Sequence, residues 1–384
     1  MAVNEGQGAV GPVGGPAPLR GQVVYLYAFD LAYDMKREPV ARLLGEPVKE
    51  YSIGPSKRSP KHLLFYRPQM VNLPTAERTL LGKTVAIERS VKLFGVGAIS
   101  IQVRAPFEVD RLEVLVQYHD AAFTTGDIEQ EVRELAEQVR KELLPYCIRP
   151  VPRIQEGEAY TVFCLDAVPS ENGPPKGARA WLAENRRQVA ALLAHETDAG
   201  SLSMQSVRES TNQWLSYYDS DLVVVDWDAA LVVGERESLD DVLHIMALAN
   251  VQLLELSVYD QILDSSLERA YRHMVRWGRR SPRVRRSLRE IRIDLARLSD
   301  ELSNITKFFG DWRLARIYGH LSLSFHLADW HRIIAEKLRT LADLYELLQQ
   351  DRRNFWMVVL EAAIILLFVI DLVVLFMQLS QARN

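Results

Sequence analysis

Two carboxylates, those of Glu361 and Asp371, lie inside the most apolar run of the chain, residues 355–379. An α-helix of these 25 residues is about 37 Å long, enough to cross a hydrocarbon core of about 30 Å. Seventeen of them are Leu, Ile, Val or Phe, so the run predicts a transmembrane helix. An acid at that depth needs a proton, water or a partner, which leaves two interpretations. The acids make packing contacts with a neighbouring helix, or they serve ion conduction or regulation.

A second candidate for chemistry is the segment between Arg269 and Arg292, which holds ten arginines and a single acid, Glu290. Such a segment is suited to the phosphates of RNA or the head groups of anionic lipid. The alternative is a solvated edge whose arginines pair with acids elsewhere in the chain. The predicted phosphate or lipid contacts are Arg279, Arg280, Arg283, Arg285 and Arg286.

Motifs of catalysis are not found in the sequence. The two cysteines, Cys147 and Cys164, form no CxxC pair, and the "HETD" that begins at His195 lacks the second histidine of a zinc protease. No phosphate-binding GxxxxGK[ST] occurs, and no serine, cysteine or histidine lies in a nucleophile signature. We therefore expect no enzyme, no cofactor and no metal.

The helices that must position these residues show a coiled-coil pattern. Apolar side chains recur at spacings of three and four in residues 288–309, and again in residues 327–348. These two seams most simply pair as an antiparallel hairpin, although pairing between subunits would give the same pattern. The predicted stalk packing residues are Leu288, Ile291, Leu295, Leu298, Leu302, Ile305, Phe308 and Phe309.

Before the helices, the chain predicts an α+β domain. Short β-type runs such as "VVYLYAFD", "GAISIQVRAPF", "RLEVLVQY" and "YTVFCLD" alternate with two helical segments near residues 127–146 and 178–196. The mostly apolar stretch 239–263 predicts a helix buried against this domain. The predicted division is a tail (1–20), an α+β domain (21–234), a helical stalk (235–350) and an anchor (351–384).

The charge distribution predicts the orientation of the anchor. Arg352 and Arg353 precede the span and Arg383 alone follows it, so the positive-inside rule keeps the body in the cytoplasm. The N-terminal 21 residues are rich in Gly and Pro and resemble neither a signal nor a transit peptide. With a net charge of −4, the chain as a whole has no general affinity for nucleic acid.

The order of the helical elements resembles the required-for-meiotic-nuclear-division family of membrane-anchored proteins. "IMALANVQLLELSVYDQILD" is similar to the first helix of that family, "FFGDWRLARIY" to its double-Phe tract and "IAEKLRTLADLYELL" to its stalk. Glu361, and Asp371 in place of a second Glu, match its acidic span, so the resemblance covers residues 221–379. It implies an inner-membrane assembly, here a bacterial one, whose eukaryotic relatives tether ribosomes.

The function predicted from these features is that of a tail-anchored, homo-oligomeric scaffold that localises a cytosolic partner. The resemblance implies that this partner is related to the ribosome or to RNA. The alternative is a component of an oligomeric ion channel or transporter whose acids face inward. Magnesium channels of the CorA type share the long helices, but they have two spans joined by a Gly-Met-Asn turn. This chain has one such span and lacks that tripeptide.

Overall fold

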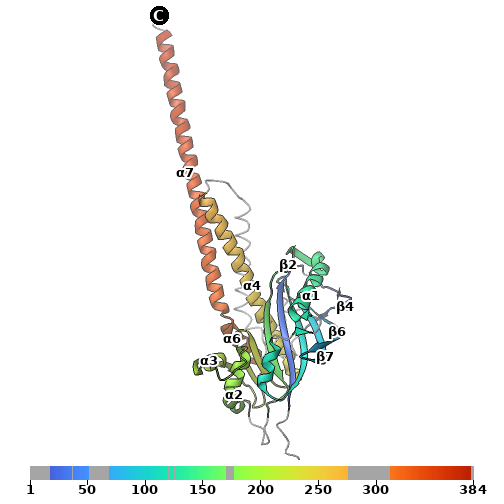
Figure 1. Ribbon diagram of the computed structural model, residues 1–384. Helices are drawn as coiled ribbons and strands as arrows, with labels where there is room; N and C mark the ends of the chain where they lie inside the picture. Colours follow the sequence, from blue (N-terminus) through green and yellow to red (C-terminus); the bar gives the residue numbers. More distant parts are fainter. Residues whose placement is uncertain are drawn as a thin grey trace, which may run out of the picture. The chain divides into compact units, whose positions relative to one another are not determined.

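The computed structural model describes residues 18–36, 38–51, 69–119, 122–123, 126–169, 177–275 and 312–381 (Figure 1). The chain divides into two compact units. The first, here called the body, comprises residues 1–257 and 301–328; the second, the helical unit, comprises 258–300 and 329–384. The predicted boundary between residues 234 and 235 falls between a strand and a helix of the body.

The body is built on one large mixed sheet, which confirms the α+β class. Its described part has 11 strands in the order β10-β9-β6-β7-β8-β1-β12-β15-β14-β13, with β5 pairing β6. The pairs are antiparallel except that of β12 with β15. The strands are β1 (Leu19–Asp30), β5 (Lys49–Glu50), β6 (Gln69–Leu80), β7 (Lys83–Leu93), β8 (Ala98–Val109), β9 (Ala122–Phe123), β10 (Gly126–Asp127), β12 (Glu158–Leu165), β13 (Gln213–Leu215), β14 (Leu222–Val225) and β15 (Ala229–Val233).

Two-stranded pairs and short helices complete the periphery of the body. The pairs are β2 (Ala32–Met35) with β11 (Cys147–Pro150) and β3 (Arg42–Leu43) with β4 (Glu46–Pro47). The short helices are η2 (Leu112–Tyr118), η3 (Leu144–Tyr146) and α3 (Met204–Ser210).

One face of the sheet packs against α1 (Ile128–Leu143), α2 (Ala178–Leu193) and η2. Alternate residues of the long strands, such as Val23, Tyr25, Ile101 and Val103, share one apolar core with the buried sides of these helices. The Asp127 side chain caps α1 by accepting from the Glu129 amide at 3.1 Å. Val132, Leu135, Val139 and Leu143 of α1 are buried in this core, so the predicted helical segment near residues 127–146 is confirmed.

The other face of the sheet is covered by the first half of α4 (Arg236–Val275), as predicted for the apolar stretch 239–263. Asn250 Nδ2 donates to the Glu158 carbonyl at 3.0 Å, and Val242, Ile245 and Met246 are buried. On this face the alternation of the strands is partly polar, because β7 and β8 place Lys92, Ser100 and Gln102 under the helix. The sheet thus has two covered faces, one apolar and one mixed.

A short helix, α6 (Trp312–Ser324), packs on β13 and β14 within the body. It buries Leu314, Ile317, Tyr318 and Leu321, which recur at helical spacing. Tyr318 Oη donates to Gln252 Oε1 at 2.7 Å, and the ring of Phe325 meets that of Tyr160 edge to face. His326 then adopts a positive φ of 50°, which ends this helix before the next one begins.

The helical unit pairs α7 (Leu327–Gln381) with the second half of α4 (Figure 1). Lys337 Nζ lies 2.6 Å from Asp260 Oδ1 and 2.7 Å from Asp264 Oδ1, and Leu263, Ile334 and Leu341 are fully buried. The second predicted seam is therefore a packed one, and its partner among the described residues is α4. The first predicted seam, from Leu288 to Phe309, lies outside the described residues.

Two strand predictions need correction. The run "RLEVLVQY" is not a strand but the 3-10 helix η2, because Leu112, Leu115 and Val116 are buried together at helical spacing. Conversely β6 was not predicted, because Pro74 interrupts its pattern; the strand accommodates the proline where its register with β7 shifts between Leu73 and Ala76.

The structure does not confirm the predicted C-terminal membrane span. Among the described residues, the helix segment long and apolar enough to cross a membrane is Ser238–Glu268, and 83% of its most apolar window is buried. That burial is typical of a core helix, in agreement with the packing of α4 on the sheet. The C-terminal span remains a prediction.

Candidate functional site

A buried lysine is the most unusual ionisable group of the body. Lys92 lies on β7 opposite Ser100 of β8, on the face covered by α4, and is 3% exposed. Its Nζ atom lies 4.8 Å from the centroid of the Tyr51 ring. Burial, reinforced by the nearby charge of Arg104, lowers the pKa of Lys92 to about 7. The amine is therefore partly neutral near physiological pH.

Polar groups from α4 surround this lysine. Tyr51 Oη donates to the Asp240 carbonyl at 3.0 Å and lies 3.3 Å from Asp241 Oδ1, while Arg104 Nη2 lies 2.6 Å from Asp240 Oδ1. The ring of His244 lies 4.7 Å from that of Tyr51, and burial lowers the pKa of His244 well below its usual range. Burial thus disfavours the charged forms of two potential cations in one cluster.

The chemistry open to this cluster is limited by access. Lys92 and His244 are both almost completely buried, so a substrate does not reach either nitrogen in the described conformation. Buried Ser100 Oγ and His244 Nδ1 have no hydrogen-bond partner among the described residues. We therefore interpret the cluster as a structural contact between the sheet and α4, whose contribution to the stability of the body depends on pH.

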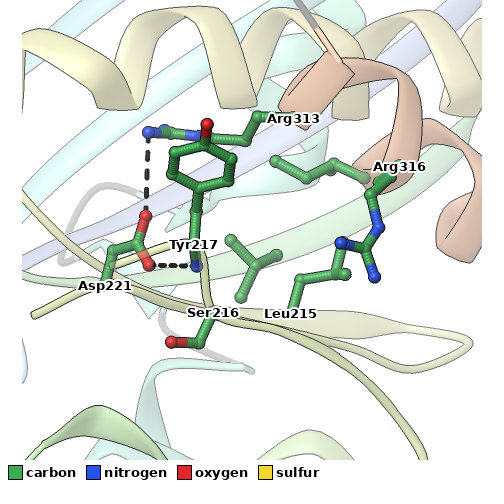
Figure 2. A pocket seen from close by; sticks show the side chains of 8 residues that line it. Leu215, Ser216, Tyr217, Asp221, Arg313 and Arg316 are labelled. Atoms are coloured by element: carbon green, nitrogen blue, oxygen red, sulfur yellow. Dashed lines mark hydrogen bonds and ion pairs between the residues drawn. The ribbon is translucent and has the colours of Figure 1, made fainter. Parts of the chain in front are cut away.

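An open pocket lies elsewhere on the body, where α6 meets β13 and β14 (Figure 2). Asp221 organises it: its Oδ1 accepts from the Tyr217 amide at 2.7 Å and from the Tyr218 amide at 2.8 Å, and its Oδ2 lies 3.7 Å from Arg313 Nη1. Figure 2 shows Arg313 reaching from α6 across the Tyr217 ring. The lining residues are Leu215, Ser216, Tyr217, Asp221, Val223, Arg313, Arg316 and Ile317.

Arg316 differs from Arg313 in its surroundings. It is exposed, its guanidinium carbon lies 5.4 Å from the centroid of the Trp312 ring, and it forms no ion pair within the described part of the chain. Leu215, Val223 and Ile317 supply an apolar floor beside it. The pocket therefore combines one available positive charge with an apolar surface and aromatic rings.

The predicted intramembrane acids both lie on α7 and are exposed. Between residues 356 and 372 all 13 large apolar side chains are exposed, from 38% at Val359 to 68% at Met357 and Phe368. Glu361 and Asp371 form no ion pair or hydrogen bond with described residues. The structure therefore leaves their predicted role untested.

The other predicted site residues fall outside the described part of the chain. This applies to the arginines Arg279, Arg280, Arg283, Arg285 and Arg286 and to the eight stalk residues between Leu288 and Phe309.

Both structural clusters were missed by sequence reasoning. Lys92 follows Glu88 and Ser90 in strand alternation, a pattern typical of a solvent face, and only the packing of α4 buries it. For the pocket a local signal did exist, because the adjacent pair Tyr217 and Tyr218 stands between polar residues before a strand.

Comparison with known proteins identifies the family through the body. The family model described as "Uncharacterized protein MJ0711, N-terminal domain" matches residues 20–240, which is more than half of the chain. The chain is also 23% identical to the uncharacterized protein MJ0711 of Methanocaldococcus jannaschii over 247 residues, 63% of this chain and 73% of that protein. No solved structure matches.

These matches correct the resemblance drawn from the helices. The required-for-meiotic-nuclear-division family was inferred from residues 221–379, whereas the matching family model covers the sheet and its α1 and α2 helices. The helical order and the spaced acids that suggested the resemblance are features that unrelated helical segments share, so that assignment was wrong. The chain belongs to the MJ0711 N-terminal domain family.

Proposed function

We propose that this chain is a membrane-anchored, homo-oligomeric scaffold that holds its α+β body at the cytosolic side of a membrane and localises a partner there. The observation that supports this is the surface of α7 between residues 356 and 372. All 13 large apolar side chains of that stretch are exposed around the helix. A helix that is apolar all round requires an apolar environment.

The energetics favour lipid as that environment. On a membrane-insertion scale each Leu, Ile, Val or Phe favours insertion by roughly 0.5 kcal/mol, so the 17 of them in residues 355–379 contribute about 8 kcal/mol. Each central acid opposes insertion by about 3 kcal/mol. The balance supports insertion of residues 355–379, and the arginines at 352 and 353 support a cytosolic body.

The two acids support assembly of several copies. Glu361 and Asp371 have no partner among the described residues, and a lone helix in lipid would offer them none. Copies of α7 around an axis would place the acids in two rings, where shared protons, water or cations satisfy them. The same arrangement supports the second candidate, an ion channel or transporter component.

The proposal is tested by alkaline carbonate extraction of membranes that contain the full-length chain. We expect the chain in the membrane pellet, and we expect a variant with Leu366, Leu367 and Phe368 changed to Asp to move to the supernatant. The matched control changes three exposed side chains of the body, Tyr33, Leu81 and Met204, to Asp, and should stay in the pellet. Full-length chain in the supernatant would reject the anchor.

A further inference from the structure

The outer side of α6 carries a stripe of side chains that the body leaves uncovered. Trp312, Arg316 and Leu323 follow one another at spacings of four and seven, on the side opposite to the buried residues of the helix. Trp312 is 65% exposed and Leu323 is 63% exposed. Between them, a Cβ atom on Gly319 would meet no atom within 4 Å, so the surface between these side chains is open.

Two tyrosines extend this stripe across the pocket of Figure 2. Tyr217 is 56% exposed and Tyr218 is 61% exposed, and their rings meet edge to face at 4.8 Å. Asp221 holds both of their backbone amides, so the loop that presents the rings is fixed before any ligand arrives. A fixed aromatic loop loses little conformational entropy on binding.

The charge of this surface selects the ligand. The sequence of α6 contains two arginines and no acid. Arg313 lies against Asp221, which leaves the guanidinium of Arg316 as the available cation at the pocket. A carboxylate beside an apolar group would satisfy both Arg316 and the floor made by Leu215, Val223 and Ile317.

We propose that α6 and the Tyr217 loop dock an acidic, amphipathic segment of a protein partner, with a carboxylate on Arg316 and an apolar anchor side chain in the pocket. Exposed Trp, Tyr and Arg are the residue types that dominate binding energy in protein interfaces. The pocket is open to solvent and far smaller than a small-molecule site, with a cavity volume of about 20 Å³, so it suits the end of a single side chain.

Single-stranded nucleic acid is the competing ligand, because exposed aromatic rings also stack on bases. A single strand requires a positively charged groove along its backbone, whereas Arg316 is the one arginine of this pocket without an ion pair among the described residues, so the protein ligand is favoured. This inference rests on the proposed function, since the segment belongs to the partner that the scaffold localises.

The test uses the full-length chain in mild detergent and two fluorescent 18-residue helical peptides. The first has Leu and Phe on one face and only Glu on the other, and the second replaces every Glu with Lys. We expect the acidic peptide to bind at least tenfold more tightly than the basic one. Trp312→Ala and Arg316→Glu should each weaken its binding at least tenfold. The matched control Arg332→Glu, at an exposed arginine of α7, should not.

Several outcomes would overturn the docking surface. Equal affinity for both peptides, no binding of either, or binding unchanged by Trp312→Ala and Arg316→Glu would each do so. Binding of oligo(U) that these variants abolish would assign the surface to nucleic acid instead. A change in subunit number in these variants would make it a contact between copies of the chain.

Membrane anchoring is measured separately, by carbonate extraction. Carbonate extraction of Trp312→Ala and Arg316→Glu should match that of the parent chain, because both residues belong to the body. Peptide binding by a chain that carbonate releases would retain the docking surface and reject the membrane scaffold. A chain that stays in the pellet but binds neither peptide would retain the membrane anchor and reject the docking surface.

Discussion

The Nζ atom of Lys92 lies 4.8 Å from the centre of the Tyr51 ring, in a layer where α4 closes over the sheet. The ring offers the amine a cation–π contact, yet burial still lowers the pKa of Lys92 from 10.5 to about 7. His244 and Tyr51, together with Asp240, Asp241 and Arg104, are the other ionisable groups that face this amine. The contact therefore couples the stability of the body to protonation.

Lys92→Met should stabilise the body at neutral pH. The unfolded chain binds a proton at this lysine up to about pH 10.5 and the folded chain only up to about pH 7, so stability rises with pH between these values. The slope is at most about 1.4 kcal/mol per pH unit. Between pH 7.5 and 8.5 the free energy of unfolding of the parent chain should rise by about 1 kcal/mol, as measured by urea unfolding in mild detergent.

The methionine variant should lose this slope, and it should exceed the parent in stability most clearly at pH 7.5. Lys83→Met, at an exposed lysine of the same strand, is the control and should leave both stability and slope unchanged. The chosen window avoids the titration of His244 below pH 6.5 and of the unfolded thiols above pH 9. If the Lys92→Met variant kept the parent's dependence of the unfolding free energy on pH, Lys92 would not be the cause of that dependence.

Gly97 is predicted to be indispensable to the β7–β8 turn. Its φ is +98°, and a Cβ atom there would lie 1.9 Å from the Ala32 carbonyl oxygen. Its own carbonyl accepts from the Leu31 amide at 2.9 Å, so the backbone has no freedom to move away. Gly97→Ala should therefore cost more than about 3 kcal/mol in free energy of unfolding.

Gly82 offers the matched comparison, because its φ of +77° is also left-handed but a Cβ would meet nothing within 4 Å. Gly82→Ala should cost about 1 kcal/mol, the price of the backbone conformation alone. Thermal unfolding of both variants separates the close approach from the conformation. Equal losses of stability in the two variants would show that the backbone near Ala32 moves to accommodate the added Cβ atom at little cost.

Lys337 joins the two helices of the helical unit. Its amine lies between Asp260 and Asp264, and the side chains of Lys337 and Asp260 are 24% and 19% exposed. Lys337→Met should cost about 1–3 kcal/mol, because it leaves a largely buried carboxylate unpaired. The exposed pair of Arg332 with Asp329 is the control, and Arg332→Met should change stability by less than about 0.5 kcal/mol. Similar losses in both would mean that burial does not strengthen the Lys337 pair.

The arginine-rich segment between Arg269 and Arg292 is predicted from the sequence to bind phosphate groups. Changing Arg279, Arg280, Arg283, Arg285 and Arg286 to Gln should weaken binding of the chain to vesicles of anionic lipid or to RNA, whichever the parent binds. The parent's affinity should fall steeply with salt, as expected for phosphate contacts. Co-sedimentation with phosphatidylserine vesicles and filter binding of oligo(U) are the two measurements. If binding changed neither with salt nor with the substitutions, the alternative interpretation of the segment as a solvated edge would be favoured.

The sequence predicted the strands that are marked by their residue types and failed where tertiary contacts decide. The runs that became β1, β7, β8 and β12 are rich in β-branched and aromatic residues, whereas β6 contains Pro74 and η2 is an apolar run too short to tell from a strand. Lys92 could not have been predicted as a buried group, because its environment comes from a helix more than a hundred residues later. The seam of α7 was readable, since Ile334, Leu338 and Leu341 follow helical spacing, but its partner in α4 was not.

The last prediction concerns Glu361 and Asp371, which ten residues at about 100° each place roughly 80° apart around α7 and about 15 Å apart along it. Both can therefore face one seam of an assembly. Each acid disfavours insertion of a single helix, so Glu361→Leu with Asp371→Leu should leave membrane insertion intact or improve it. We expect the same double variant to change the subunit number or the thermal stability of the assembly in mild detergent.

Cysteines provide the positional test of this arrangement. Glu361→Cys and Asp371→Cys should each crosslink between subunits, and Leu366→Cys, at a position about 140° from Glu361 around the helix, is the control that should not. If the double variant keeps the parent's subunit number and thermal stability, and neither cysteine crosslinks, the acids do not organise the assembly. Ion flux through reconstituted parent chain that the double variant loses would favour the channel. Altered assembly without flux would favour the scaffold, because the acids would then hold subunits together without forming a path for ions.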